Sequence, residues 1–253
     1  MYIDLRGIKL KFRLVRSTFE RVFTKKEEAG LLEQYYKGKH LFNGTCFRLE
    51  RVVEESGMVV LEVSETDFYS LLVTNLLHRE LLVLQTRSVT EYTVLDDKYF
   101  SNNLAISVVL EDTENRVLLA KRSTEVAIGG KIYATSVTGS FDYTDTVDDG
   151  FRVLFDLVRK EVFEETGIGI TENELEVQGL FIGKEKLQPV LLCKVRLGVS
   201  FDVSSLGGMD ADLEVNGFDI VSKDRLRSYL EMPMTEVARY HLGLEKVNIG
   251  VKA

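Results

Sequence analysis

The sequence is poor in cysteine, histidine and proline, and each shortage excludes a class of protein. Its two cysteines, Cys46 and Cys193, lack the Cys-x-x-Cys spacing of zinc fingers, and its three histidines are scattered over 253 residues. Both thiols are expected to be buried apolar groups in a reducing compartment. With two prolines and 45% hydrophobic residues, the composition predicts a globular chain and excludes a collagen-like or disordered one.

Acidic residues outnumber basic ones, and long apolar runs are scarce. A formal net charge of −8 and a pI near 5.1 argue against an extended nucleic-acid partner, which needs clustered lysine and arginine. No apolar run reaches the length of a membrane span, and charged residues within Met1–Arg16 interrupt the apolar stretch that a signal peptide needs. We therefore expect a cytoplasmic protein without membrane contact. A small anionic ligand held through a bound cation is compatible with the acidic charge.

Three common catalytic signatures are missing. The sequence contains no G-x-x-x-x-G-K-[ST] loop, no H-E-x-x-H pair and no G-x-S-x-G elbow. It therefore gives no support to a P-loop, zincin or α/β-hydrolase mechanism. The scattered histidines likewise give no particular support to a Ser-His-Asp triad.

The first third of the chain is predicted to be rich in β-strands. Apolar and basic residues alternate over Ile8–Val15, which is typical of a half-buried strand. Thr24 is suited to cap a short helix. Two further strands are predicted over Thr45–Leu49 and Met58–Val63, with a polar connection that ends in Ser56-Gly57.

The hydropathy pattern of the sequence changes near residue 100, where longer apolar runs begin. We predict buried strands over Leu104–Leu110 and Val117–Ala120, a strand over Tyr133–Thr138, and a polar loop that begins at Gly139. Later elements are predicted from the same patterns: two strands within Leu175–Leu197 broken at Lys184–Lys186, a strand at Phe218–Val221, and an amphipathic helix over Met234–Gly243. These elements divide the chain into a β-rich domain over residues 1–100 and a second domain over residues 101–253.

The longest predicted helix runs from Thr146 to Thr166. One apolar stripe, at helical spacing, faces the core and consists of Phe151, Leu154, Phe155, Val158 and Val162. Gly167 stands where a helix C-terminal glycine belongs. Thr146 with Asp149 approximates a capping box at the other end.

Glu161, Glu164 and Glu165 project from one face of this helix, because they are spaced i, i+3 and i+4. Their charges repel one another, and the helix dipole disfavours each by roughly 0.3–1 kcal/mol in the last turns. A hard divalent cation such as Mg²⁺ would reverse both penalties. The alternative is a solvated acidic helix end whose charges are screened by water and salt.

Residues 160–168, Lys-Glu-Val-Phe-Glu-Glu-Thr-Gly-Ile, resemble the second half of the Nudix box, R-E-U-x-E-E-x-G-U with U aliphatic. Lysine replaces the arginine of the box. Upstream the match is incomplete: Arg152 stands where the first glutamate belongs, and Gly139, followed by a longer loop, is the better counterpart of the box glycine. The resemblance implies an α+β fold, an α/β/α sandwich with a mixed sheet, preceded here by the small β-rich domain.

The same resemblance assigns roles to residues of this chain. Glu161, Glu164 and Glu165 would bind Mg²⁺, with Mn²⁺ as its substitute, and these three residues and Lys160 would be catalytic. A later carboxylate would serve as ligand or general base, and Glu214 is preferred over Glu185.

Two further positions would meet the substrate. Arg122 closes an apolar strand and has a planar fork suited to phosphate, although a solvent-facing basic residue is the alternative reading. Gly139 would line the substrate site as the box glycine. The implied enzyme is a Nudix-type diphosphatase, and such enzymes with added N-terminal domains are often homodimers.

Three short segments narrow the resemblance to the branch that hydrolyses UDP-glucose and UDP-galactose: Leu41–Leu49, Asp67–Asn75 and Asn103–Ala105. This branch implies the conversion of a UDP-sugar to UMP and a sugar 1-phosphate. The alternatives are a Nudix pyrophosphatase acting on ADP-ribose, NADH or coenzyme A, a non-catalytic sensor of nucleotide metabolites, and a structural module whose acidic helix end is only surface.

Overall fold

The computed structural model describes residues 1–39, 41–77, 89–123, 132–144, 147, 150–202, 206–207 and 215–247. The chain forms two compact units, each assembled from three segments. The first unit comprises Met1–Ala105, Ser140–Leu154 and Gly179–Leu191, and the second comprises Ile106–Gly139, Phe155–Gln178 and Leu192–Ala253. The first segment of the first unit ends at Ala105, and the division into two continuous domains at residue 100 stays a prediction.

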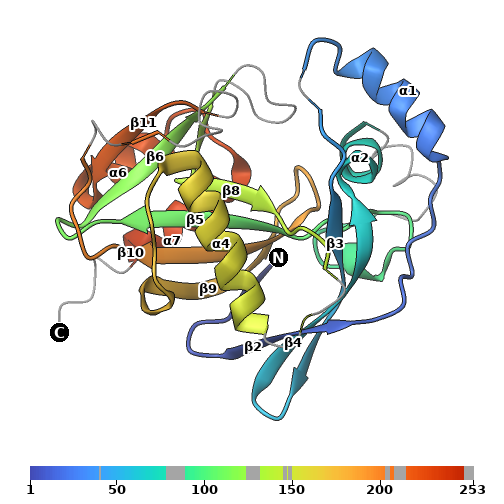
Figure 1. The fold of residues 1–253 in the computed structure, drawn as a ribbon, viewed down its shortest axis with the longest axis horizontal. Helices are drawn as coiled ribbons and strands as arrows, with labels where there is room; N and C mark the ends of the chain where they lie inside the picture. The colour runs from blue at the N-terminus through green and yellow to red at the C-terminus, as the bar shows by residue number, and fades with distance from the viewer. Residues whose placement is uncertain are drawn as a thin grey trace. The chain divides into compact units, whose positions relative to one another are not determined.

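A three-stranded sheet forms the centre of the first unit (Figure 1). Its strands are β2 (Lys9–Leu14), β3 (Thr45–Glu55) and β4 (Met58–Asp67), in the order β2-β4-β3. Strand β4 pairs antiparallel with β3 and parallel with β2. The β3–β4 hairpin turns at Ser56 and Gly57, whose φ angles of 51° and 76° are those of a type I′ turn.

Short helices complete the first unit. Helix α1 (Lys25–Tyr35) begins with the predicted cap: the Thr24 hydroxyl accepts from the Glu27 N–H at 3.3 Å, and the Glu27 carboxylate accepts from the Thr24 N–H at 2.8 Å. The remaining elements are α2 (Phe68–Leu71), the π-helical turn η1 (Leu72–Leu77), the 3-10 turn η2 (Val94–Asp96) and β1 (Tyr2–Asp4), which pairs antiparallel with Gly179–Phe181.

The larger sheet includes β1. Its other strands in the described residues are β5 (Ala105–Glu111), β6 (Arg116–Arg122), β7 (Tyr133–Ala134), β8 (Val137–Ser140), β9 (Leu175–Ile182), β10 (Pro189–Arg196) and β11 (Val215–Ser222). The strand order is β1-β9-β10-β5-β6-β11, with β7 paired to β6 and β8 paired to β5. Together with the smaller sheet and the helices, this confirms the expected α+β class.

The strand predicted over Tyr133–Thr138 is two short strands instead of one. The chain leaves β6 after β7 and joins β5 as β8, and the Ser136 hydroxyl lies at the crossing. This hydroxyl accepts from the Leu110 N–H at 2.8 Å and donates to the Leu118 carbonyl at 2.6 Å, so it replaces backbone ladder bonds to both neighbours. The prediction that Gly139 begins a loop is wrong, because β8 continues through Ser140.

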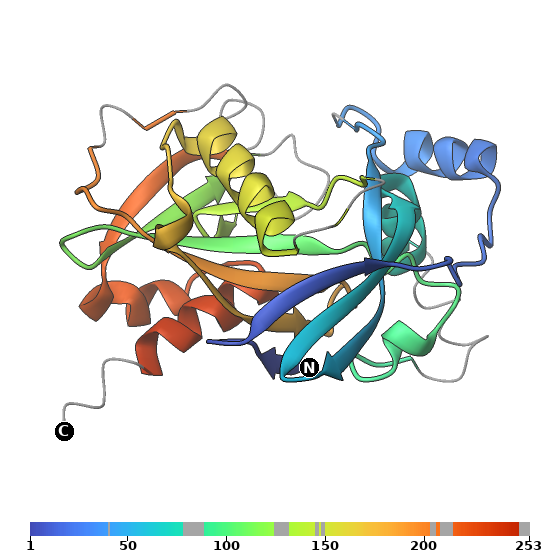
Figure 2. The same cartoon turned by 60° about the horizontal axis from the view of Figure 1, so that its bottom comes forward.

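Helices cover both faces of the larger sheet in the second unit (Figure 2). Helix α4 (Gly150–Thr166) lies over one face, and α6 (Leu226–Leu230) and α7 (Glu236–Val247) lie over the other. Two 3-10 turns, η3 (Glu172–Glu174) and η5 (Lys223–Arg225), connect these layers. None of the helices in the described ranges has both the length and the apolar character needed to cross a membrane.

Helix α4 ends where the sequence predicted but begins later. Gly167 has φ +75°, and its N–H donates to the Phe163 carbonyl at 2.9 Å, as expected of a C-terminal glycine. The start at Thr146 is wrong, because Val147 is not helical and α4 begins at Gly150. Thr146 and Asp149, the expected capping pair, lie outside the described residues.

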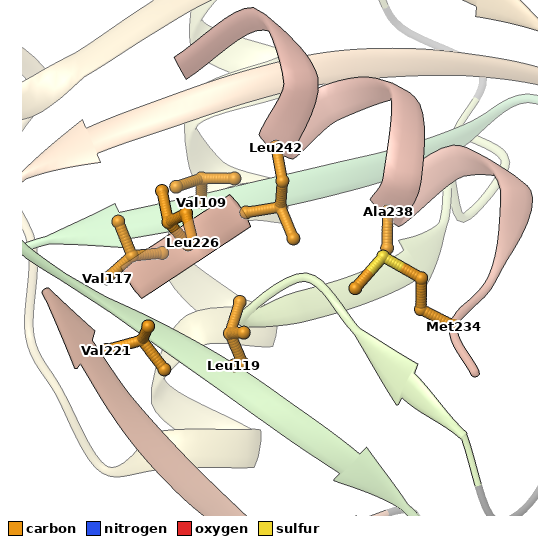
Figure 3. Packing of buried hydrophobic residues seen from close by; sticks show 8 residues of the cluster. All are labelled: Val109, Val117, Leu119, Val221, Leu226, Met234, Ala238 and Leu242. Carbon is orange, nitrogen blue, oxygen red and sulfur yellow. The ribbon is translucent and has the colours of Figure 1, made fainter. Parts of the chain in front are cut away.

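The contact between α6, α7 and the sheet is apolar (Figure 3). Its buried members come from strands β5, β6 and β11, from the two helices and from the segment between the helices: Val109, Val117, Leu119, Val221, Leu226, Met234, Ala238 and Leu242. Burial of this apolar surface, at about 25 cal/mol per Å², attaches the two helices to the sheet.

A buried polar network also joins α7 to the sheet. The His241 ring lies between the Ser107 hydroxyl, 3.0 Å from Nδ1, and Gln178 Oε1, 2.8 Å from Nε2. Gln178 Nε2 donates to Glu245 Oε1 at 2.7 Å, so its Oε1 faces His241 as an acceptor. Glu245 Oε2 in turn accepts from Lys194 Nζ at 2.5 Å. His241 is therefore neutral, with the proton on Nε2.

This network predicts an acid-sensitive fold. Burial, and then the charge of Lys194, lower the pKa of His241 from 6.5 to about 3. The unfolded chain binds this proton below pH 6.5 and the folded chain does not, so the free energy of unfolding should fall on acidification. The maximal slope is about 1.4 kcal/mol per pH unit. In urea unfolding, the wild-type slope should steepen from pH 7 and approach this maximum near pH 5, and His241→Gln should show a much shallower slope; equal slopes would contradict the assignment.

Candidate functional site

The three glutamates of α4 differ in exposure because the helix packs its apolar stripe inward. Leu154, Phe155, Val158 and Val162 are buried and Phe151 is half-buried, as the spacing predicted. Glu165 is only 5% exposed, whereas the side chains of Glu161 and Glu164 are 17% and 29% exposed. The Glu165 carboxylate therefore lies within the contact between helix and sheet, and those of Glu161 and Glu164 lie nearer to solvent at its rim.

Glu161 lies directly against strand β8. A Cβ atom built on Gly139 would be 2.7 Å from Glu161 Cδ and 2.8 Å from its Oε2. Real Cβ atoms essentially never approach other atoms so closely. Only glycine at this position leaves room for the carboxylate beside the strand backbone. The structure therefore brings together two of the residues that the sequence singled out.

Thr138 connects two more of these residues. Its backbone N–H faces Glu165 Oε1 at 3.4 Å, and its hydroxyl accepts from Arg122 Nη1 at 3.1 Å. Arg122 is the last residue of β6 and is half-buried. One residue of β8 thus touches both the candidate phosphate ligand and a candidate metal ligand.

Lys160 lies at the exposed rim of the same helix turn. Its Nζ is 3.7 Å from Glu161 Oε1 and 4.0 Å from Glu164 Oε2. The Lys160 side chain is 46% exposed, so solvent weakens both ion pairs. Lysine also lacks the planar fork of the arginine that the Nudix box carries at this place. It balances charge here without fixing the carboxylates in one geometry.

The candidate bases are not part of this described arrangement. Glu214 lies outside the described residues. Glu185 is exposed in the turn between β9 and β10, within the first unit. Of the residues that the structure describes, no three His, Cys, Asp or Glu side chains form a group that could hold a metal ion by themselves.

The donor set still fits a magnesium ion. Mg²⁺ retains several waters and commonly takes only one or two protein carboxylates together with substrate phosphate. Glu161 and Glu164 provide partly exposed carboxylate oxygens, and the missing side chain at Gly139 leaves room for the Glu161 carboxylate beside β8. A closed cage of three protein ligands is therefore not required.

Sequence reasoning missed Thr138. In the sequence it is one β-branched residue at the end of a strand pattern, where threonine is common for its packing alone. Its role depends on contacts to Arg122 and Glu165, which are 16 and 27 residues away. Only the adjacent Gly139 offered a signal, through its possible match to the box glycine.

No protein-family profile and no curated protein matches the sequence. Solved structures resemble the fold at low identity. The NUDIX domain of Shewanella oneidensis NrtR, complexed with ADP ribose, gives a TM-score of 0.44 at 14% identity over 64% of this chain and 99% of that chain. A NUDIX hydrolase from Nitrosomonas europaea gives 0.41 at 17% identity, over 58% and 89%.

A third structure is a bifunctional NMN adenylyltransferase/ADP ribose pyrophosphatase from Francisella tularensis, complexed with AMP and an Mn ion. Its TM-score is 0.42 at 13% identity, over 72% of this chain and 49% of that chain. Function is therefore inferred from the residues of this chain.

The contact between Gly139 and Glu161 yields a prediction. Gly139→Ala should push the Glu161 carboxylate away from β8, because its flexible end can move more easily than the strand. We expect Mn²⁺ affinity to fall about tenfold, measured by titration calorimetry, while stability changes by less than about 1 kcal/mol.

Gly169→Ala is the matched control. Gly169 is exposed in the second unit, and a Cβ there meets nothing within 4 Å. Unchanged Mn²⁺ affinity in Gly139→Ala, or an equal loss in Gly169→Ala, would show that the close approach does not position a metal ligand.

Proposed function

We propose that the chain is a Nudix-type hydrolase that cleaves the diphosphate linkage of a nucleoside diphosphate derivative with a divalent metal ion. The main support is the Glu161 carboxylate, which lies against β8 where Gly139 has no side chain. Glu161 is also the glutamate of the Lys-Glu pair in the resemblance to the Nudix box. Helix stability does not explain carboxylates crowded at a helix C-terminus, whereas a bound cation does.

Each residue of the candidate site is proposed to have a role that follows from its position. Bound Mg²⁺, or Mn²⁺ in its place, would neutralise the diphosphate and lower the pKa of a coordinated water. Glu161 and Glu164 would hold the ion at the rim of α4, with Glu165 anchored on β8 behind them. Arg122 would bind phosphate oxygens through its planar guanidinium. Lys160 would pair with the two rim carboxylates.

The preferred substrate is a UDP-sugar, by resemblance to the UDP-glucose and UDP-galactose branch. The three segments that carry this resemblance are neighbours within the first unit. Thr45 pairs with Asp67 across β3 and β4, and the Leu104 N–H donates to the Phe47 carbonyl at 2.8 Å. Segments so far apart in sequence therefore contribute to one structural feature, which favours a common origin of the three short matches over chance.

The preferred general base is Glu214. It directly precedes Val215, and Val215 pairs with Arg122 across β11 and β6. A base must come within hydrogen-bond reach of the attacking water, near the phosphate that Arg122 would bind. Glu185, exposed in its turn, is the second choice. The homodimer and the cytoplasmic location stay predictions from the sequence.

The proposal predicts a specific product. Purified protein with Mg²⁺ should release UMP and sugar 1-phosphate from UDP-glucose or UDP-galactose, as measured by chromatography. ADP-ribose, NADH, dinucleoside polyphosphates and coenzyme A are tested in parallel as alternative substrates. Hydrolysis of one of the other compounds alone would support a Nudix-type hydrolase and reject the UDP-sugar branch. Tight metal-dependent binding with no product from any compound would instead favour a sensor of nucleotide metabolites.

Removal of single carboxylates tests the site itself. Glu161→Gln and Glu164→Gln should each lower kcat by at least about tenfold and weaken Mn²⁺ binding, since each replaces a charged ligand by a neutral amide. Glu172→Gln is the matched control, because Glu172 is exposed in η3 of the same unit. If all three variants retain wild-type activity and metal affinity, the acidic helix end is only surface.

A further inference from the structure

Thr138 has two contacts that point to different parts of the candidate site. Its side-chain oxygen accepts from Arg122 Nη1 at 3.1 Å. Its backbone N–H faces the carboxylate of Glu165 at 3.4 Å. The two partners come from β6 and α4, and Thr138 lies in β8. All three belong to the second unit.

The chemistry of the contact with Arg122 is informative. An arginine side chain carries about 2 kcal/mol of rotamer entropy, so a free one must be ordered when it binds a phosphate. A carboxylate could order it, but would also neutralise its charge. A hydroxyl is neutral, so this contact orients the guanidinium without itself neutralising the positive charge.

The backbone contact adds a second constraint. The N–H that faces Glu165 belongs to the residue whose hydroxyl binds Arg122, so both contacts depend on the position of β8. Gly139, the next residue, lies against Glu161. Two consecutive residues of β8 thus contact two metal-ligand candidates and one phosphate-ligand candidate.

We propose that Thr138 is a positioning residue that orients the Arg122 guanidinium toward the diphosphate of the substrate and fixes it relative to the glutamates of α4. This inference rests on the proposed function. Thr138 acts through Arg122 and does not itself meet the reacting atoms. Its hydroxyl should therefore affect diphosphate affinity and KM, and not metal affinity or kcat.

The test separates the hydroxyl from the rest of the residue. Thr138→Val keeps the shape and the backbone N–H but removes the acceptor, and Thr138→Ser keeps the hydroxyl. Thr113→Val is the matched control, since Thr113 is exposed between β5 and β6 and its hydroxyl lies 2.9 Å from that of Ser200. Titration calorimetry with Mg²⁺ and methylenediphosphonate, a non-hydrolysable diphosphate, measures affinity whether or not turnover occurs.

Thr138→Val should weaken methylenediphosphonate binding about three- to tenfold, while Thr138→Ser and Thr113→Val stay within about twofold of wild type. Mn²⁺ affinity should be the same in all four proteins. In an Arg122→Gln background, Thr138→Val should have no further effect, because the two residues act as one unit. With an active substrate, the Thr138→Val loss should appear in KM and leave kcat unchanged.

Several results would overturn the inference: unchanged diphosphate affinity in Thr138→Val, an equal loss in Thr138→Ser, or additive losses in the Arg122→Gln background. A wild-type protein that does not bind methylenediphosphonate would also overturn it. These outcomes differ from failure of the proposed function alone, in which diphosphate binding follows the predicted pattern but no compound is hydrolysed.

Discussion

The close approach of strand β8 to helix α4 is the constraint on which the candidate site depends. At Gly139 the strand backbone comes so near to the Glu161 carboxylate that no Cβ fits between them. One residue earlier, the Thr138 N–H faces Glu165. Two side chains of one helix turn thus contact two consecutive residues of the strand. Because α4 also buries Val158 and Val162 against the unit, its apolar stripe and its acidic face are fixed by the same packing.

This arrangement opposes helix stability. Three carboxylates in the last turns of α4 meet the negative end of the helix dipole, at roughly 0.3–1 kcal/mol each, and repel one another. Lys160, nearly half exposed, offsets only part of this cost. Under the proposed function, the acidic face is a binding surface for a cation that accepts few protein ligands.

The sequence predicted elements that depend on local pattern. The α4 stripe, its end at Gly167 and the strands on both sides of it follow from periodicity and from glycine at a positive φ. Long-range contacts could not be predicted in this way. Ser136 divides the expected strand into β7 and β8 because its hydroxyl bonds to both β5 and β6. Thr138 becomes part of the candidate site only through its contacts with residues distant in sequence, and a local sequence pattern does not predict such contacts.

Strand β8 is held from the opposite side of the unit as well. His241 of α7 bonds to the Ser107 hydroxyl, which lies 2.9 Å from the Thr135 hydroxyl. The Thr135 hydroxyl oxygen also lies 3.4 Å from the Val137 carbonyl oxygen, one residue before Thr138. The buried polar network and the candidate site therefore share one short segment of chain. Rigidity is what a metal and diphosphate site requires, since misplaced ligands lose affinity steeply. A neutral, buried histidine on one face thus helps to fix charged residues on the other, although no side chain of α7 needs to touch them.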